Sequence, residues 1–265
     1  MIKHCNCRKA EVPVKALFAV LFGGVLTTAN AASEQAHSSN WRLGMAVASA
    51  DAAYKGRNSD TFVVPVIGYE GKKLYFRGIE LGYRLYQHQS TELAAVVSVA
   101  PFRFEPKKNR IEGLQQLDAR DFRVESGLKY SKRTRFGRFS AQSLVNIRDF
   151  STGYRSSVGY FYSLSKQPRR WQFGPRIEVN YISGSFADYY YAVSAAEAER
   201  SGLNEYNSND SWNTTLGFEG YMRLNQRWSI AGSLNRTFLG SEISNSPMTA
   251  GSHTTSAFIF LSYQL

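Results

Sequence analysis

The sequence predicts an all-β protein that forms a transmembrane antiparallel β-barrel, and three observations support this fold class. The chain begins with a segment that has the features of an export signal. From Trp41 onward, short segments with alternating apolar and polar residues follow one another. The last of them, Ala257–Leu265, ends the chain, and every second residue in it is apolar or aromatic.

Residues 1–31 predict a cleaved signal peptide. Its basic region contains Lys3, Arg8, Lys9 and Lys15. The apolar stretch Ala16–Ala29 follows, and Ala29-Asn30-Ala31 is an A-x-A cleavage site. An uncleaved anchor helix is the weaker alternative, because this stretch is shorter than the roughly 20 residues that span a bilayer. We expect residues 32–40 to form a periplasmic tail and residues 41–265 to form the barrel.

Composition narrows the classes of chemistry and partner. Both cysteines, Cys5 and Cys7, lie in the leader, so the exported chain has no disulfide, thiol nucleophile or cysteine metal site. The net charge of +11 falls to +8 when the leader, with four basic residues and one acidic residue, is removed. A basic exported chain is expected to meet outer-membrane lipid, lipopolysaccharide or the acidic cell wall, and not nucleic acid.

Twelve segments alternate with a period of two, which places successive side chains on opposite faces of a strand. They are 41–48, 61–69, 73–77, 79–86, 93–99, 121–130, 138–147, 158–164, 171–181, 214–218, 228–234 and 257–265. In the clearest segment, 121–130, the apolar residues Phe122, Val124 and Leu128 are expected on the face opposite to Glu125 and Lys129. Unpaired amides are costly in hydrocarbon, so the first strand must pair with the last. We predict twelve strands; loss of the weak segment 73–77 with its neighbour would give ten.

The connections alternate between tight turns and long loops, except for two short outer connections, at Gly78 and at residues 151–153. The tight turns are 70–72, 87–90, 131–135, 166–168 and 225–226, and the long loops are 52–60, 105–119, 184–210 and 240–252. Outer-membrane barrels have short periplasmic turns and longer outer loops. Both chain ends are therefore expected on the periplasmic side. The tryptophans and several tyrosines fall at strand ends, where aromatic girdles form at the membrane interfaces.

The end of the chain resembles the closing strand of bacterial outer-membrane barrels. Tyr263 is third from the end and Leu265 is the apolar last residue. In such barrels these residues also serve as the assembly signal, so we expect Tyr263 and Leu265 to serve as that signal. Leu265 departs from the usual Phe.

The polar faces of the strands define the expected lumen. Its charged residues are Arg42, Arg77, Arg84, Arg123, Lys129, Arg138, Arg148, Arg155, Arg170, Arg176 and Arg223, with Glu80, Glu92, Glu125, Glu178 and Glu219. Two interpretations remain open. One is a narrow, anion-leaning pore, and the other is a packed interior of salt bridges, which we favour because buried charges usually need partners.

Two regions are candidate interaction surfaces. In the loop 183–210, Ser194 and Glu197 form a capping box, which predicts a short helix that ends at Gly202. Tyr189, Tyr190 and Tyr191 precede this helix and are expected near the outer rim. The second region is the set of basic inner turns. It includes Lys132, Arg133, Lys166 and Arg169, which would face the cell wall and its enzymes.

The loop sequence from Asp188 to Ala198, followed by Tyr206, resembles the MltA-interacting protein family, also called MipA/OmpV. Further matching positions are Tyr54-Lys55-Gly56, Pro65, Tyr69, Gly78, Leu81-Gly82-Tyr83 and Ser246-Pro247. Ala192 is a departure, since Gly is commoner there. The resemblance implies an outer-membrane barrel. For the name-giving member it implies a scaffold that joins a murein-cleaving lytic transglycosylase to a murein synthase.

Catalytic patterns are weak. His88-Gln89-Ser90 has the spacing of outer-membrane phospholipase A but falls in a turn, and Ser163–Lys166 matches S-x-x-K at the end of a strand, where that motif does not function. No acidic pair accompanies His253. A polar loop is a better interpretation of Asn207–Asp210 than a calcium site. We therefore predict no enzyme, cofactor or metal, and favour a scaffold over a small pore or uptake protein.

Overall fold

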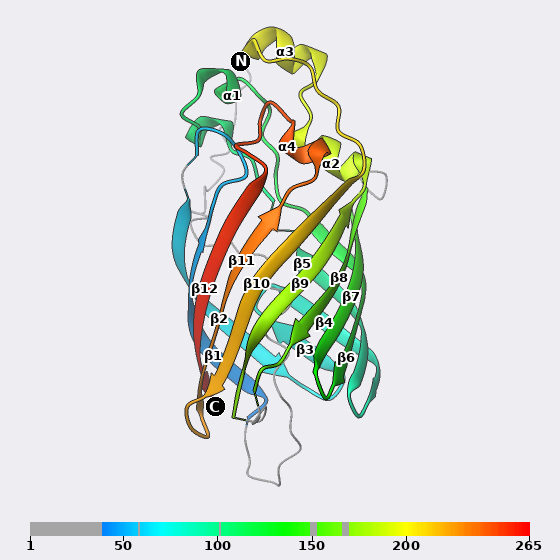
Figure 1. Ribbon diagram of the computed structural model, residues 1–265, viewed down its shortest axis with the longest axis vertical. Helices are drawn as coiled ribbons and strands as arrows, with labels where there is room; N and C mark the ends of the chain where they lie inside the picture. The colour runs from blue at the N-terminus through cyan, green and yellow to red at the C-terminus, as the bar shows by residue number, and fades with distance from the viewer. Residues whose placement is uncertain (1–38, 58, 101, 149–152, 166–169) are drawn as a thin grey trace, which may run out of the picture.

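The computed structural model describes residues 39–265 except 58, 101, 149–152 and 166–169, and it is a closed barrel of antiparallel strands (Figure 1). The strands are β1 (Trp41–Ala50), β2 (Asp60–Glu70), β3 (Leu74–Arg77), β4 (Glu80–His88), β5 (Thr91–Val99), β6 (Val124–Thr134), β7 (Gly137–Asn146), β8 (Tyr154–Tyr162), β9 (Trp171–Ile182), β10 (Ser211–Arg223), β11 (Trp228–Phe238) and β12 (His253–Gln264). The predicted count of twelve, not ten, is confirmed.

The barrel closes between its first and last strands, as predicted. β1 pairs with β12 from Arg42↔Gln264 to Ala50↔Ser256. At the same end, Ser39 N donates to Leu265 O over 2.9 Å, and Leu265 N donates to Trp41 O over 3.2 Å. This pairing removes the unpaired edges that the first and last strands would otherwise expose to hydrocarbon.

Side chains alternate across the wall in the way the sequence predicts. Apolar residues such as Leu128 and Ile259 are exposed on the outside at 52% and 59%, whereas Glu125 on the inside is 1% exposed. Aromatic pairs mark the two ends of the outer surface: the ring centroids are 5.0 Å apart both for Trp228 and Tyr263 at one end and for Tyr181 and Trp212 at the other. The outside is therefore a lipid face with aromatic girdles.

The end that carries the chain terminus and the tight turns is the lower end in Figure 1. Here one predicted turn is corrected: β6 runs to Thr134, where it pairs with Gly137, so Lys132 and Arg133 belong to the strand and not to the turn. Lys132 is exposed and Arg133 is half-buried. Lys166, Arg169, the predicted signal peptide and most of the predicted tail lie outside the described residues. Short turns place this end in the periplasm.

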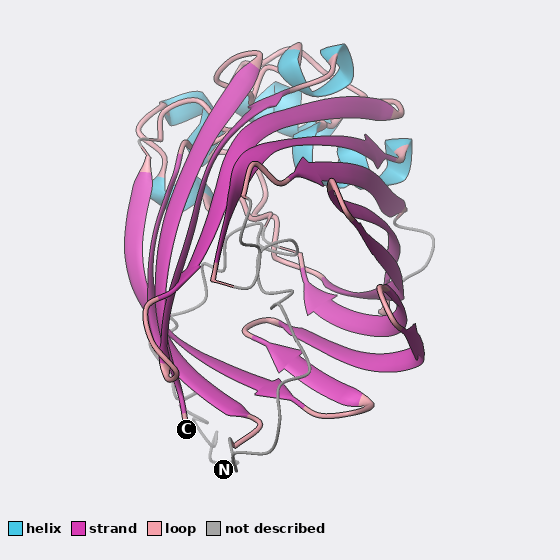
Figure 2. Cartoon of the chain, turned by 60° about the horizontal axis from the view of Figure 1, so that its bottom comes forward, coloured by secondary structure: helices cyan, strands magenta, loops and turns pink. Residues whose placement is uncertain are grey.

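The helices of the described residues all lie at the opposite end (Figure 2). They are η1 (Pro106–Lys108), α1 (Glu112–Gln115), α2 (Gly184–Tyr191), α3 (Ala195–Ser201) and α4 (Ser241–Ser244). The predicted helix is α3, which has the Ser194–Glu197 capping box and ends at Gly202 with φ 70°. α2 was not predicted. In the described part of the chain, no helix has the length and apolar character needed to cross a membrane.

Candidate functional site: the barrel interior and its outer cap

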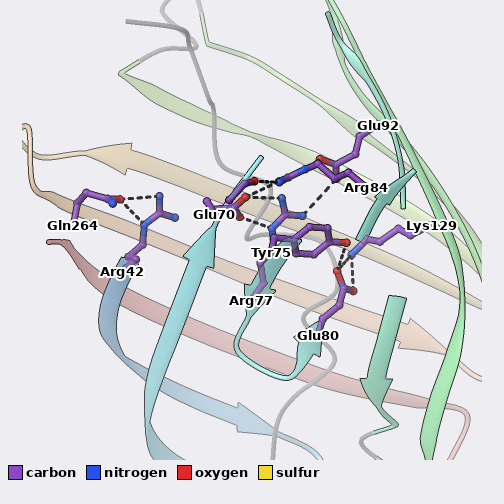
Figure 3. Close-up of polar contacts among 10 residues, drawn as sticks. Arg42, Glu70, Tyr75, Arg77, Glu80, Arg84, Glu92, Lys129 and Gln264 are labelled. Atoms are coloured by element: carbon purple, nitrogen blue, oxygen red, sulfur yellow. Dashed lines mark hydrogen bonds and ion pairs between the residues drawn. The ribbon is translucent and has the colours of Figure 1, made fainter. Parts of the chain in front are cut away.

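A network of charged side chains surrounds the short β3–β4 hairpin on the inside of the barrel (Figure 3). Glu70 Oε1 lies 2.6 Å from Arg77 Nε, and Glu70 Oε2 lies 2.6 Å from Arg84 Nη2. Arg84 Nε reaches Glu92 Oε2 over 2.6 Å. The sequence interpretation missed Glu70, because it placed this residue in a turn. As the last residue of β2, Glu70 instead faces the lumen and joins two arginines.

Tyr75 connects this network to a second one. Its side chain is fully buried, and its hydroxyl donates to Glu80 Oε1 over 3.0 Å. Lys129 Nζ lies 2.9 and 2.8 Å from the two oxygens of Glu80. A Cβ at Gly82 would lie 2.0 Å from the Tyr75 ring, so the absence of a side chain at Gly82 makes room for this tyrosine. That contact explains the glycine of the Leu81-Gly82-Tyr83 motif.

The other carboxylates of the lumen are also paired. Glu125 Oε2 lies 2.8 Å from Arg155 Nε and 2.7 Å from Nη2, and Glu219 Oε1 lies 2.6 Å from Arg138 Nη2. Arg176 pairs with Glu178. Arg148, Arg170 and Arg223 were placed in the lumen, but they are exposed and lie at or beyond the ends of strands. In the described interior each of these carboxylates is in a salt bridge, as the favoured interpretation expects. Arg42 instead donates to Gln264 Oε1, and Arg123 lies over the Tyr189 ring.

The outer end of the barrel is covered by a hydrophobic cluster that we call the cap. It draws residues from four outer connections and from the end of β9. Its buried members are Tyr54, Phe104, Leu114, Leu117, Ile182, Phe186, Ala187, Tyr190, Tyr191, Val193, Ile243 and Met248. Helix α2 supplies four of them, which is why its aromatic sequence folds as a helix that packs inward. Tertiary packing, not helix propensity, stabilises this segment.

The tyrosines expected at the rim lie inside the cap, which corrects that expectation. Tyr190 is 0% exposed and Tyr191 is 2% exposed. The Tyr54 hydroxyl donates to Tyr190 O over 3.2 Å. Tyr189 is half-buried, and its ring lies 3.6 Å below the Arg123 guanidinium. Only Tyr189 of the three offers surface to a partner; Tyr190 and Tyr191 hold the connections together.

Glu197 fastens α3 to the loop between β5 and β6. Its carboxylate accepts the Asp118 N–H over 2.9 Å and the Ser194 N–H over 3.0 Å, and it lies 2.7 Å from Arg120 Nη2. Burial by itself would raise the Glu197 pKa, but the two N–H donors and Arg120 outweigh it and lower the pKa to about 2. The ionised carboxylate therefore stabilises the cap.

We expect acid to loosen this contact. The Glu197 pKa in the folded cap is lowered from 4.5 to about 2, so its stabilising effect is present above pH 4.5 and is lost as the pH falls towards 2. Limited proteolysis with an acid-stable protease should therefore cut the cap faster at pH 2.5 than at pH 5. Glu197→Gln should be cut rapidly at both values, and an equal response of parent and variant to pH would contradict the assignment.

A cavity of about 310 Å³ lies between the cap and the charged network. Its lining includes the aromatic residues Tyr54, Phe102 and Tyr191. Its polar wall includes Asn213 and Asn235, from β10 and β11. A volume near 300 Å³ is at the lower end of the range for sites that hold small molecules.

The histidines considered for catalysis and the terminal residues considered as an assembly signal lie far from one another or outside the cavity. His88 is the exposed last residue of β4, and His253 opens β12 at the other end of the barrel. Within the described residues, no group of three or more His, Cys, Asp or Glu side chains could hold a metal ion. Tyr263 accepts from Arg227 Nη1 over 2.8 Å, and Leu265 is 51% exposed. Their role as an assembly signal stays a prediction.

Known proteins resemble this chain over most of its length. The family described as MltA-interacting protein MipA matches residues 43–265. The MltA-interacting protein of Escherichia coli K12 is 31% identical over 231 residues, which cover 87% of this chain and 92% of that protein. A protein of the same strain, named putative outer membrane protein YiaT, is 31% identical over 213 residues, which cover 80% of this chain and 86% of YiaT. An outer membrane channel of Pseudomonas putida F1 superposes with a TM-score of 0.46 at 11% identity, covering 87% of this chain and 97% of that one.

Proposed function

The chain belongs to the MltA-interacting protein MipA family, and from that premise we propose that it is a docking platform for enzymes that cleave and synthesise murein. It is a β-barrel of the outer membrane, and several of its relatives are outer membrane proteins by name. The resemblance of its loop motif implies partners of the lytic transglycosylase and murein synthase classes. We propose that it acts by being contacted and not by catalysis.

The observation that carries this proposal is the charge of the periplasmic end. Among the described residues there, every exposed charged side chain is basic, and the acidic side chains Glu70 and Glu92 face the lumen. The exposed basic residues are Lys72, Lys73, Lys132, Arg135, Arg170, Arg223 and Arg227. A surface of one sign of charge raises the encounter rate with the anionic cell wall and with an acidic partner protein.

Removing this charge should weaken capture of the partners. The variant Lys72→Gln, Lys73→Gln, Lys132→Gln, Arg135→Gln loses four positive charges from exposed positions. We expect it to recover less murein and fewer murein enzymes than the parent in a pull-down from envelope extract at low salt. The difference should shrink at high salt, because exposed charges are screened.

A matched control removes the same charge from the other end. Lys55→Gln, Lys107→Gln, Lys108→Gln, Arg110→Gln also loses four exposed positive charges, all on the cap side. This cap-side variant should recover the same amount of murein enzymes as the parent. Equal loss in both variants would mean that net charge, and not the periplasmic surface, governs recovery. The cap residues are instead proposed to meet lipopolysaccharide and outer-leaflet lipid.

A further inference from the structure

One strand of the barrel wall has an incomplete partner. β2 pairs with β1 along its whole length, from Ala50↔Asp60 to Trp41↔Tyr69. On its other side β2 pairs with β3 only at Gly68, Tyr69 and Glu70, because β3 has four residues. Among the described residues, the outer half of β2 therefore has no strand on that side.

The orientation of the β2 backbone shows which N–H and C=O groups point towards this unpaired side. Glu70 N donates to Asn40 O, so the even-numbered residues of β2 direct their amide groups towards β1. The odd-numbered residues direct theirs towards the other edge, where Ile67 O accepts the Gly78 N–H over 3.2 Å. Beyond that bond the edge consists of Pro65, Val63 and Thr61. Proline has no N–H to donate, so Pro65 fits a strand side without a ladder partner, and edges are among the few places where sheets accept proline.

An unpaired edge in the membrane needs an explanation. Irregular backbone at membrane depth is tolerated where it is buried in protein or lines a cavity, and not where it faces lipid directly. The cavity beneath the cap reaches this edge. Its lining includes Phe62 on β2, Ile79 at the tip of the β3–β4 hairpin, and Ser98 and Val99 at the end of β5.

On the β2 side of the edge the inner wall is apolar, whereas Arg77 and Glu80 of the β3–β4 hairpin line the same cavity. Phe62, Val64 and Val66 face inward and pack against a cluster on β1, β11 and β12. The buried members of that cluster are Ala46, Ala48, Ala231, Phe258 and Phe260. Barrel interiors are normally polar. An apolar lining next to a break in the wall is suited to molecules that come from lipid.

We propose that the break between β2 and the tip of the β3–β4 hairpin is a lateral portal between the outer half of the bilayer and the cavity. The ligand class is a small amphipathic molecule. Its apolar body would lie against Phe62 and Phe102, and its hydrogen-bonding group would face Asn213 and Asn235. This portal is independent of the periplasmic docking surface.

A bilayer-dissolved photolabel tests the portal on the unaltered protein. The barrel is reconstituted in phospholipid vesicles with trifluoromethyl-phenyl-diazirine, irradiated, and mapped by mass spectrometry. Outward-facing Val63 is labelled in any case, being 59% exposed. The portal predicts label on Phe62 and Phe102 as well. Phe161 is buried on β8 and does not line the cavity, so it should stay unlabelled. If Val63 is labelled but Phe62 and Phe102 carry no more label than Phe161, the proposal is overturned.

Variants at the hairpin tip identify the route. Ile79→Trp narrows the break and Ile79→Ala widens it, so label on Phe62 should fall in the first and rise in the second, while label on Val63 stays constant. If the amount of label on Phe62 is the same in both variants as in the parent, the label enters by another route and the portal is overturned. Cyclohexanol should protect Phe62 better than methylcyclohexane does, since only the alcohol can use the polar wall. Equal protection would overturn the amphipathic ligand class.

Discussion

Replacing Arg155 with Met should destabilise the barrel by about 3–5 kcal/mol, the usual cost of removing one partner from a buried ion pair. Arg155 contacts Glu125 through Nε and Nη2, at 2.8 and 2.7 Å from Oε2. The Glu125 side chain is 1% exposed, so the variant leaves a carboxylate with little access to water. Urea unfolding of the vesicle-bound barrel, followed by tryptophan fluorescence, measures the loss.

Two comparisons make that result specific. Arg155→Met combined with Glu125→Leu removes both charges and should recover most of the loss, since an apolar pair of similar size can replace a buried ion pair at little cost. Arg200→Met breaks a pair of similar length, 2.6 Å to Asp118, whose side chains are 41% and 67% exposed. It should cost less than about 1 kcal/mol. Equal losses for Arg155→Met and Arg200→Met would contradict a packed, salt-bridged interior.

Leu128→Arg should cost about 2–4 kcal/mol, the range for a basic residue at the middle of the lipid face of a barrel. Leu128 lies near the centre of β6 and is 52% exposed on the outer surface. Its matched control is Gln142→Arg on β7. Gln142 lies opposite Lys129 in the pairing of β6 with β7, and it lines the cavity. There the guanidinium remains in a polar interior, so the cost should be much smaller. The opposite order in urea unfolding would mean that the two faces of the wall are inverted.

The fold could be predicted because a membrane barrel repeats one simple rule. Alternation fixes which side chains face lipid, as Leu128 and Glu125 show, and the cost of unpaired amides fixes the pairing of β1 with β12. The family motif and the capping box at Ser194 were also local features. Even the weak segment at residues 73–77 was recognised as a strand.

What the sequence could not supply depends on contacts between distant segments. Tyr190 and Tyr191 are buried because four outer connections fold over them, and no local pattern distinguishes such a tyrosine from one at an exposed rim. Glu70 joins the lumen network because β2 ends one residue later than the turn pattern indicates. The break beside Pro65 follows from the length of β3 relative to its neighbours, a property of the assembled wall.

We propose that the cap and the salt bridges of the lumen close this barrel to ions, and that the protein acts through contact at its periplasmic end. Ion conductance of the purified protein in a planar bilayer distinguishes this proposal from a small pore. We expect no stable conductance steps at neutral pH, from the parent or from the Lys72→Gln, Lys73→Gln, Lys132→Gln, Arg135→Gln variant. Regular, anion-selective steps from the parent would contradict the claim and establish the small pore in place of the scaffold.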